Sequence, residues 1–148
     1  MDPVCITENA FEPETLHYEF RQSVNEAGAI VAFTGLVRAE EKVTKLKLSH
    51  YPDFTENEIK KIGDVAQTRW KLQNWHISHR IGEMKPQEPI VFVATASRHR
   101  RHAFEAVDFL MDYLKSEAPF WKQEYRGQES RWIEPRAQDR SDIKRWDS

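Results

Sequence analysis

The sequence predicts an α+β fold in which helices pack on a mostly antiparallel sheet. Short apolar, β-branched stretches typical of strands alternate with amphipathic stretches typical of helices, in the order β-α-β-β-α-β-β-α-β. Because this order lacks a strict β-α-β rhythm, a sheet of parallel strands is not favoured. The chain has 148 residues, the size of one domain, so residues 1–148 are expected to form a single unit.

The first half of the chain is predicted to hold three strands and two helices. The strands are expected at residues 3–7, 29–37 and 45–51, and the helices at 12–24 and 55–70. Gly35 would weaken an ordinary strand, which indicates a bulge or the close approach of another group. Thr55 and Glu58 have the spacing of a capping box at the start of the second helix. The single cysteine, Cys5, is expected to be a buried structural thiol.

The second half is organised around an apolar strand at residues 90–96 and the long helix that follows it. Pro119 is expected to end this helix by Ala118. A further strand is expected at 75–81, a turn at 82–89 and a last strand at 120–125. The apolar face of the helix is predicted to carry Phe104, Val107, Met111 and Leu114.

The C-terminal tail is charged but carries large apolar side chains, namely Trp132, Ile133, Ile143 and Trp146. A monomer of this size has little reason to keep so much apolar surface at its end. Residues 127–148 are therefore expected to dock at the interface of a dimer of this chain.

The composition argues against several classes of function. A net charge of −2 and a pI of about 6.3 argue against a nucleic-acid binder. One cysteine cannot form a cysteine-rich zinc site, and His76 and His79 would lie on opposite faces of one strand, so no metal site is expected. The sequence has neither a signal-peptide pattern nor an apolar run that could span a membrane, so we expect a cytoplasmic protein.

Cationic residues gather where the apolar strand meets the long helix. Residues 98–102 read Arg-His-Arg-Arg-His, and no acidic residue occurs between Ile90 and Glu105. The first turn of a helix has unpaired N–H groups and the positive end of the helix dipole. Cationic side chains at this place are therefore repelled by the dipole unless an anion binds there. A bound phosphate or carboxylate would resolve the repulsion, and the alternative is a solvated basic turn.

Three further cations are candidates for the same site. Arg38 ends one apolar strand and His99 follows another, so both would reach one sheet edge if these strands are neighbours. Lys122 lies among apolar residues, and desolvation would favour a neutral amine that can act as a base or nucleophile. Plainer interpretations stay open, with Lys115 as a partner of the helix dipole and Lys122 as a solvated residue of an edge strand.

Four motifs resemble the large, catalytic subunit of molybdopterin synthase. They are F-T-G-L-V-R at residues 33–38, H-R-I-G-E at 79–83, S-R-H-R-R-H-A-F at 97–104 and K-S-E-A-P-F-W-K-Q-E at 115–124. The resemblance runs from about Gly28 through Trp146. The loop at residues 39–44 departs from it, because it is shorter than in many members and acidic at its start.

The resemblance implies an α/β hammerhead-type fold and a sulfurtransferase of molybdenum cofactor biosynthesis. It implies a homodimer of large subunits within a heterotetramer, in which each large subunit binds a small ubiquitin-like subunit that ends in Gly-Gly. The C-terminal thiocarboxylate of that subunit would pass sulfur to cyclic pyranopterin monophosphate, and two transfers would form the dithiolene of molybdopterin. No cofactor or metal is expected to take part.

The resemblance also implies roles for individual residues. Lys115 and Lys122 would be catalytic and bind substrate, and Arg136 would serve the neighbouring subunit's pocket. The other implied substrate-binding residues are Leu36, Val37, Arg38, His99, Arg100, Gln123 and Glu124. The alternative function is a non-catalytic module that grips the C-terminal carboxylate of a ubiquitin-like protein.

Overall fold

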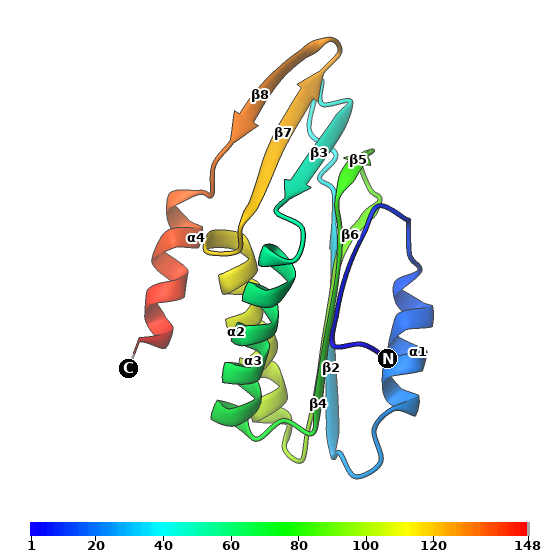
Figure 1. Ribbon diagram of the computed structural model, residues 1–148, viewed down its shortest axis with the longest axis vertical. Coiled ribbons are helices and arrows are strands. Elements are labelled where there is room, and N and C mark those ends of the chain that lie inside the picture. The colour runs from blue at the N-terminus through cyan, green and yellow to red at the C-terminus, as the bar shows by residue number, and fades with distance from the viewer. Residues whose placement is uncertain (148) are drawn as a thin grey trace.

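The computed structural model describes residues 1–147 and has the predicted α+β architecture (Figure 1). The first sheet has the strand order β1-β4-β6-β2. Its β1–β4 pair is parallel, and its other two pairs are antiparallel. Its strands are β1 (Val4–Thr7), β4 (Asn74–Arg80), β6 (Pro89–Ser97) and β2 (Ala29–Leu36).

The second sheet is antiparallel throughout and extends beyond the helices at one end of the molecule (Figure 1). It has the order β5-β3-β7-β8, with β5 (Gly82–Met84), β3 (Lys45–His50), β7 (Phe120–Arg126) and β8 (Glu129–Ile133). Strand β5 lies within the stretch that the sequence predicted to be a turn. The prediction was wrong there because three residues on an outer strand leave almost no periodic signal.

Helices cover both faces of the first sheet (Figure 1). Helix α1 (Pro13–Gln22) packs on one face, while α2 (Phe54–Trp70) and α3 (Arg100–Ser116) pack on the other. The chain ends with α4 (Ala137–Asp142) and a 3-10 turn at Ile143–Trp146. Among residues 1–147, no helix has the length and apolar character needed to cross a bilayer.

The main core lies between the first sheet and the α2–α3 layer. Strand β6 is buried along nearly its whole length, as its uninterrupted apolar run predicts. Helix α2 comes close to β4 at Gly63, where an added Cβ atom would lie 2.1 Å from the ring of Trp75. Only glycine permits this approach, and it brings α2 and α3 down onto the sheet that carries His79.

Of four local predictions about single residues, one is confirmed and three are wrong. The β2–β6 register shifts between Gly35 and Leu36, which confirms the predicted irregularity. The predicted capping box is wrong, because Thr55 is buried and its hydroxyl donates to the carbonyl of Pro119 at 3.0 Å. Cys5 is exposed rather than buried, since its side chain lies on the outer strand β1. Phe104, expected on the buried face of α3, is 57% exposed because the described residues leave the first turns of α3 uncovered on that side.

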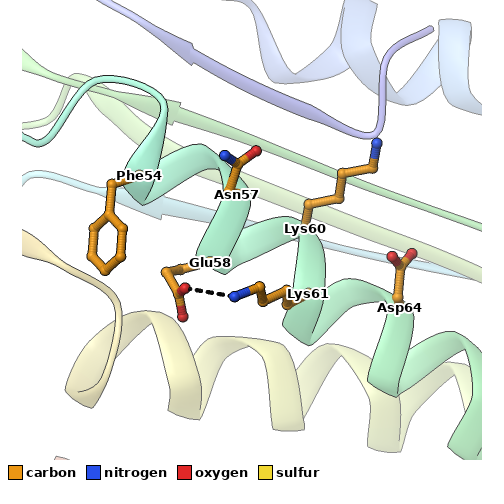
Figure 2. A pocket seen from close by; sticks show the side chains of 6 residues that line it. All are labelled: Phe54, Asn57, Glu58, Lys60, Lys61 and Asp64. Carbon is orange, nitrogen blue, oxygen red and sulfur yellow. Dashed lines mark hydrogen bonds and ion pairs between the residues drawn. The ribbon is translucent and has the colours of Figure 1, made fainter.

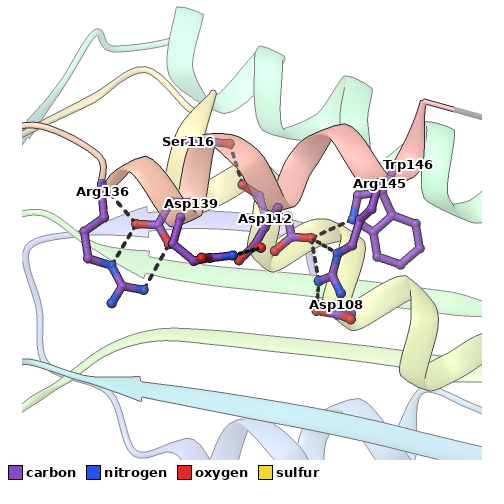
Figure 3. A network of polar contacts seen from close by, with 9 residues as sticks. Asp108, Asp112, Ser116, Arg136, Asp139, Arg145 and Trp146 are labelled. Atoms are coloured by element: carbon purple, nitrogen blue, oxygen red, sulfur yellow. Dashed lines mark hydrogen bonds and ion pairs between the residues drawn. The ribbon is translucent and has the colours of Figure 1, made fainter.

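The C-terminal tail folds back onto its own chain. The indole of Trp146 packs edge-on against Trp70 and Phe109, with ring centroids 5.5 and 5.7 Å apart. Its Nε1–H donates to Asp112 on α3 at 2.6 Å, and Arg145 donates to the same carboxylate at 2.7 Å (Figure 3). Trp146 therefore finds its apolar partners within the chain, whereas Trp132 on β8 remains 63% exposed.

Candidate functional site

Two lysines flank the turn that joins α3 to β7. Lys115 lies in the last turn of α3, and Lys122 lies near the start of β7. Burial and, to a smaller extent, the charge of Lys115 lower the pKa of Lys122 to about 8. The pKa of Lys115 is lowered as well, by partial desolvation, although its side chain keeps contact with solvent. Part of the Lys122 population therefore carries a neutral amine near neutral pH.

Charged groups from two other segments surround the lysine pair. Arg38, which follows β2, and Arg136, at the start of α4, both lower the pKa values of Lys115 and Lys122. Asp139 has the opposite effect on both lysines and is held by Arg136 at 3.2 Å (Figure 3). Four cations and one carboxylate leave an excess of positive charge, so the site suits an anionic ligand. We call these five residues the lysine site.

His79 lies beneath the lysine site and was missed by the sequence prediction, which weighed it only as a metal ligand. Its ring stacks on Phe120 with centroids 4.2 Å apart and an interplanar angle of 20°. Its Nδ1 lies 2.9 Å from the carbonyl oxygen of Arg80, which can only accept a hydrogen bond. Burial lowers the pKa of His79 to about 4, with smaller contributions from Lys122 and Lys115, so the ring is neutral at physiological pH.

The structure separates His99 and Arg100 from the lysine site of the same chain. Strands β2 and β6 are neighbours, but they pair antiparallel, with Ala29 opposite Ser97 and Gly35 opposite Val91. Arg38 therefore leaves the sheet at one end and His99 at the other, so the expected shared edge is wrong. His99 caps the start of α3 and Lys115 ends it, a span of about 24 Å at the rise of an α-helix.

The remaining predicted site residues differ in how freely they can meet a ligand. Leu36, next to the lysine site, is 47% exposed, whereas Val37 is buried and its N–H donates to the carbonyl of Glu88. Gln123 alternates with Lys122 along β7, so its side chain lies on the opposite face of the strand and donates to Ser130 at 2.9 Å. Glu124 is buried and accepts from Arg126 and Arg131, so its side chain already has two partners.

A surface hollow along α2 is a poor alternative site (Figure 2). It encloses about 380 Å³ and is lined by Phe54, Asn57, Glu58, Lys60, Lys61 and Asp64. Its charges cancel, with Lys61 and Glu58 paired at 3.1 Å. Within residues 1–147, no group of three or more His, Cys, Asp or Glu side chains is arranged to hold a metal ion.

The α+β fold and the lysine site define a class of protein with a cationic surface, suited to an anionic ligand, beside a partly neutral lysine amine. Residues 6–117 match the family described as MoaE protein. The chain is 52% identical to the molybdopterin synthase catalytic subunit of Caulobacter vibrioides, over 97% of each chain. It is 46% identical to the Escherichia coli protein of the same name, over 87% of this chain and 88% of that one. The chain belongs to the MoaE family.

Solved structures agree with this assignment. Molybdopterin cofactor biosynthesis protein E from Burkholderia multivorans superposes with a TM-score of 0.85 at 36% identity, covering 100% of this chain and 98% of that one. Molybdopterin synthase from Staphylococcus aureus superposes with a TM-score of 0.80 at 29% identity, covering 90% and 98%. The similarity extends past residue 117, so the fold of the tail is part of it.

Proposed function

We propose that this protein is the sulfur-transferring, catalytic subunit of a molybdopterin synthase. It would convert cyclic pyranopterin monophosphate to molybdopterin with sulfur from the C-terminal thiocarboxylate of a small partner subunit. The observation that carries the proposal is the lysine site, where Lys122 has a pKa of about 8 beside Lys115 and Arg38. A module that only grips a carboxylate needs cations but has no use for a neutral amine.

The lysine site offers two kinds of chemistry to these anionic reactants. Arg38 and Arg136 stay charged and can donate paired hydrogen bonds to a phosphate or thiocarboxylate. The neutral fraction of Lys122 can act as a base that accepts a proton from an acidic group of the substrate, or as a nucleophile that adds to an electrophilic carbon. Lys115 remains closer to its ordinary charged state and can stabilise negative charge as sulfur arrives. The thiocarboxylate supplies the sulfur, so the proposed step uses no bound cofactor or metal.

The partners follow from the family and from the geometry. The relatives are named catalytic subunits, which supports a second subunit. We propose that this subunit is ubiquitin-like, carries the sulfur and ends in Gly-Gly. His99 and Arg100 lie at the far end of α3, so they can join the lysine site only if a second copy of the chain supplies them. We therefore propose that the working form is a homodimer of this chain within a heterotetramer, with each pocket built from both copies.

Two further proposals concern the location of the protein and the docking of its tail. We propose a cytoplasmic location, which the relatives support because they are named as enzymes of molybdopterin synthesis. We also propose that the tail docks at the dimer interface, where the exposed indole of Trp132 would supply apolar contact.

Reconstitution tests the proposal directly. The purified protein is mixed with a thiocarboxylated small subunit and cyclic pyranopterin monophosphate, and the dithiolene product is measured. Product should form only when the small subunit carries the thiocarboxylate, and a carboxylate-terminated subunit is the matched control. A complex that binds the small subunit tightly but forms no product would favour the non-catalytic module instead.

A further inference from the structure

We propose that His79 is a positioning residue that holds the amine of Lys122 through its Nε2 atom. The inference rests on the proposed function and deepens it, because it names a group that prepares the lysine without touching the substrate. It stands on three observations: the fixed tautomer of the His79 ring, the fixed plane of that ring and the place of Lys122 on the same face of β7.

The tautomer follows from the hydrogen bond to the backbone. Because the carbonyl of Arg80 only accepts, Nδ1 of His79 must carry the proton, and Nε2 is left with a lone pair. Among the described residues, Nε2 has no hydrogen-bond partner, although the residue is only 6% exposed. Among the described residues, Arg80 Nε is the buried side-chain nitrogen or oxygen that lacks a partner, so Nε2 of His79 keeps some contact with solvent and is free to accept from a donor that reaches it.

The plane of the ring is held by Phe120, and Phe120 also fixes where Lys122 lies. The two aromatic rings are nearly parallel, at 20°, so the imidazole presents its edge rather than its face to its surroundings. Residues two apart on a strand share a face, so Lys122 projects on the same side of β7 as Phe120. The ammonium or amine of Lys122 is therefore the donor placed to meet Nε2.

Neutrality is what distinguishes this arrangement from a salt bridge. A carboxylate at this position would hold Lys122 as a permanent ammonium ion, whereas an uncharged imidazole can orient the group in both protonation states. The low pKa of His79, about 4, agrees with an acceptor that stays uncharged while the lysine titrates. The other charged groups that face Lys122 are Lys115 on α3, Arg38 after β2, and Arg136 and Asp139 at α4.

The test compares two substitutions at one position. His79→Asn keeps a donor where Nδ1 stands and removes the Nε2 acceptor, while His79→Gln keeps a polar group near the Nε2 position. His76→Asn is the matched control, because His76 is a buried histidine of the same strand that faces the opposite side and bonds Asp2 and Ser78. The titration of Lys122 is followed by NMR of lysine side-chain carbons, assigned with a Lys122→Arg variant, in the protein without substrate.

His79→Asn should lower the pKa of Lys122 below about 8, because an ammonium ion loses an acceptor. It should also lower kcat roughly tenfold, the scale of one lost hydrogen bond to a charged group. His79→Gln should recover most of the lost turnover, and His76→Asn should change neither reading. An unchanged Lys122 titration in folded His79→Asn, or an equal change in His76→Asn, would overturn the proposal.

The titration of Lys122 and the formation of dithiolene product together separate this inference from the proposed function. A shifted titration in a protein that makes no dithiolene in any form would reject the function and keep the role of His79. A normal titration in an active protein would reject only the role of His79. If His79→Asn does not fold, the turnover of His79→Gln is the deciding measurement. A polar group near the Nε2 position should preserve turnover, so a loss in folded His79→Gln as large as that in Lys122→Ala would contradict the proposal.

Discussion

Arg38 and His99 lie at opposite ends of one antiparallel strand pair, β2 and β6, although the two strands are direct neighbours. Two groups expected to bind the same substrate are thus separated by the length of α3 within one chain. A pocket that uses both must draw on two copies of the protein. Arg136, in contrast, lies beside Lys115 and Lys122 of its own chain, where it lowers their pKa values.

Mixing inactive variants tests which residues come from which copy. Arg100→Ala and Lys122→Ala chains should each fail alone, but a mixed dimer would contain one pocket with both defects and one with neither. Activity should therefore return to about half of the wild-type value per mixed dimer. The measurement is product formation after verified exchange of subunits.

The same experiment has a built-in control. Arg136→Ala mixed with Lys122→Ala should restore nothing, because both residues belong to the lysine site of one chain. Restoration by this second pair would place Arg136 in the partner's pocket, as the family resemblance implied. No restoration by the first pair would remove Arg100 from a shared pocket.

Acid should weaken the fold through His79. The folded state holds this ring neutral down to a pH of about 4, whereas in the unfolded chain it titrates near 6.5. Between these values the unfolded chain binds a proton that the folded protein does not, so stability is full above about pH 6.5 and falls as pH decreases toward 4. The loss from His79 should be about 3 kcal/mol.

Urea unfolding at pH 7 and pH 4.5 measures this loss. His79→Asn should unfold with a shallower pH dependence than the wild type, because the group that titrates differently in the two states is gone. His76 also has a pKa lowered by burial, so part of the dependence should survive the substitution. An identical pH dependence in the two proteins would show that His79 is not held neutral.

Asp112 is predicted to fasten the tail to the body of the protein. Asp112 is buried, with 9% of the residue exposed, and its carboxylate accepts hydrogen bonds from Arg145 and Trp146 (Figure 3). Asp112→Ala removes the acceptor for both groups and should lower the free energy of unfolding by about 2–3 kcal/mol. Asp108→Ala is the control, because Asp108 pairs with Arg145 at an exposed position and should cost less than about 1 kcal/mol.

Chemical denaturation measures both variants. Equal effects of the two substitutions would contradict a special role for the buried carboxylate. Because Asp139 lies in α4 and Arg136 directly precedes this helix, we also expect Asp112→Ala to loosen both residues and weaken substrate binding. Asp108→Ala should lack this effect.

The sequence predicted elements better than it predicted their pairing. Strands β2 and β6 were predicted correctly because a short run of mostly apolar residues in a small domain indicates a strand. Their antiparallel pairing was not visible, since direction depends on which strands meet in the folded state. Without the strand direction, the prediction placed Arg38 and His99 at a common edge of the sheet. The antiparallel pairing places them at opposite ends. Strand β8 left little trace because most of its side chains are exposed and polar.

The residues of the candidate site that lie close together along the chain could be predicted from the sequence. Lys115 and Lys122 flank a single proline turn, so their proximity is a local property that sequence spacing conveys. His79 and Asp139 reach the same place from β4 and α4, which are distant along the chain. His79 begins the H-R-I-G-E motif, but the motif does not indicate which residues it meets in the fold. Asp139 in particular follows Arg136 as an ordinary helix-start acid, and only the folded tail brings it to the lysines.

Product formation by Lys122→Ala tests the central claim most directly. The variant is combined with a thiocarboxylated small subunit and cyclic pyranopterin monophosphate, after its fold and its binding of the small subunit have been verified. Loss of a neutral, positioned amine should lower turnover about a hundredfold or more, and Lys115→Ala should be crippled as well. Near wild-type dithiolene formation by both folded variants would contradict the assignment of sulfur transfer to the lysine site.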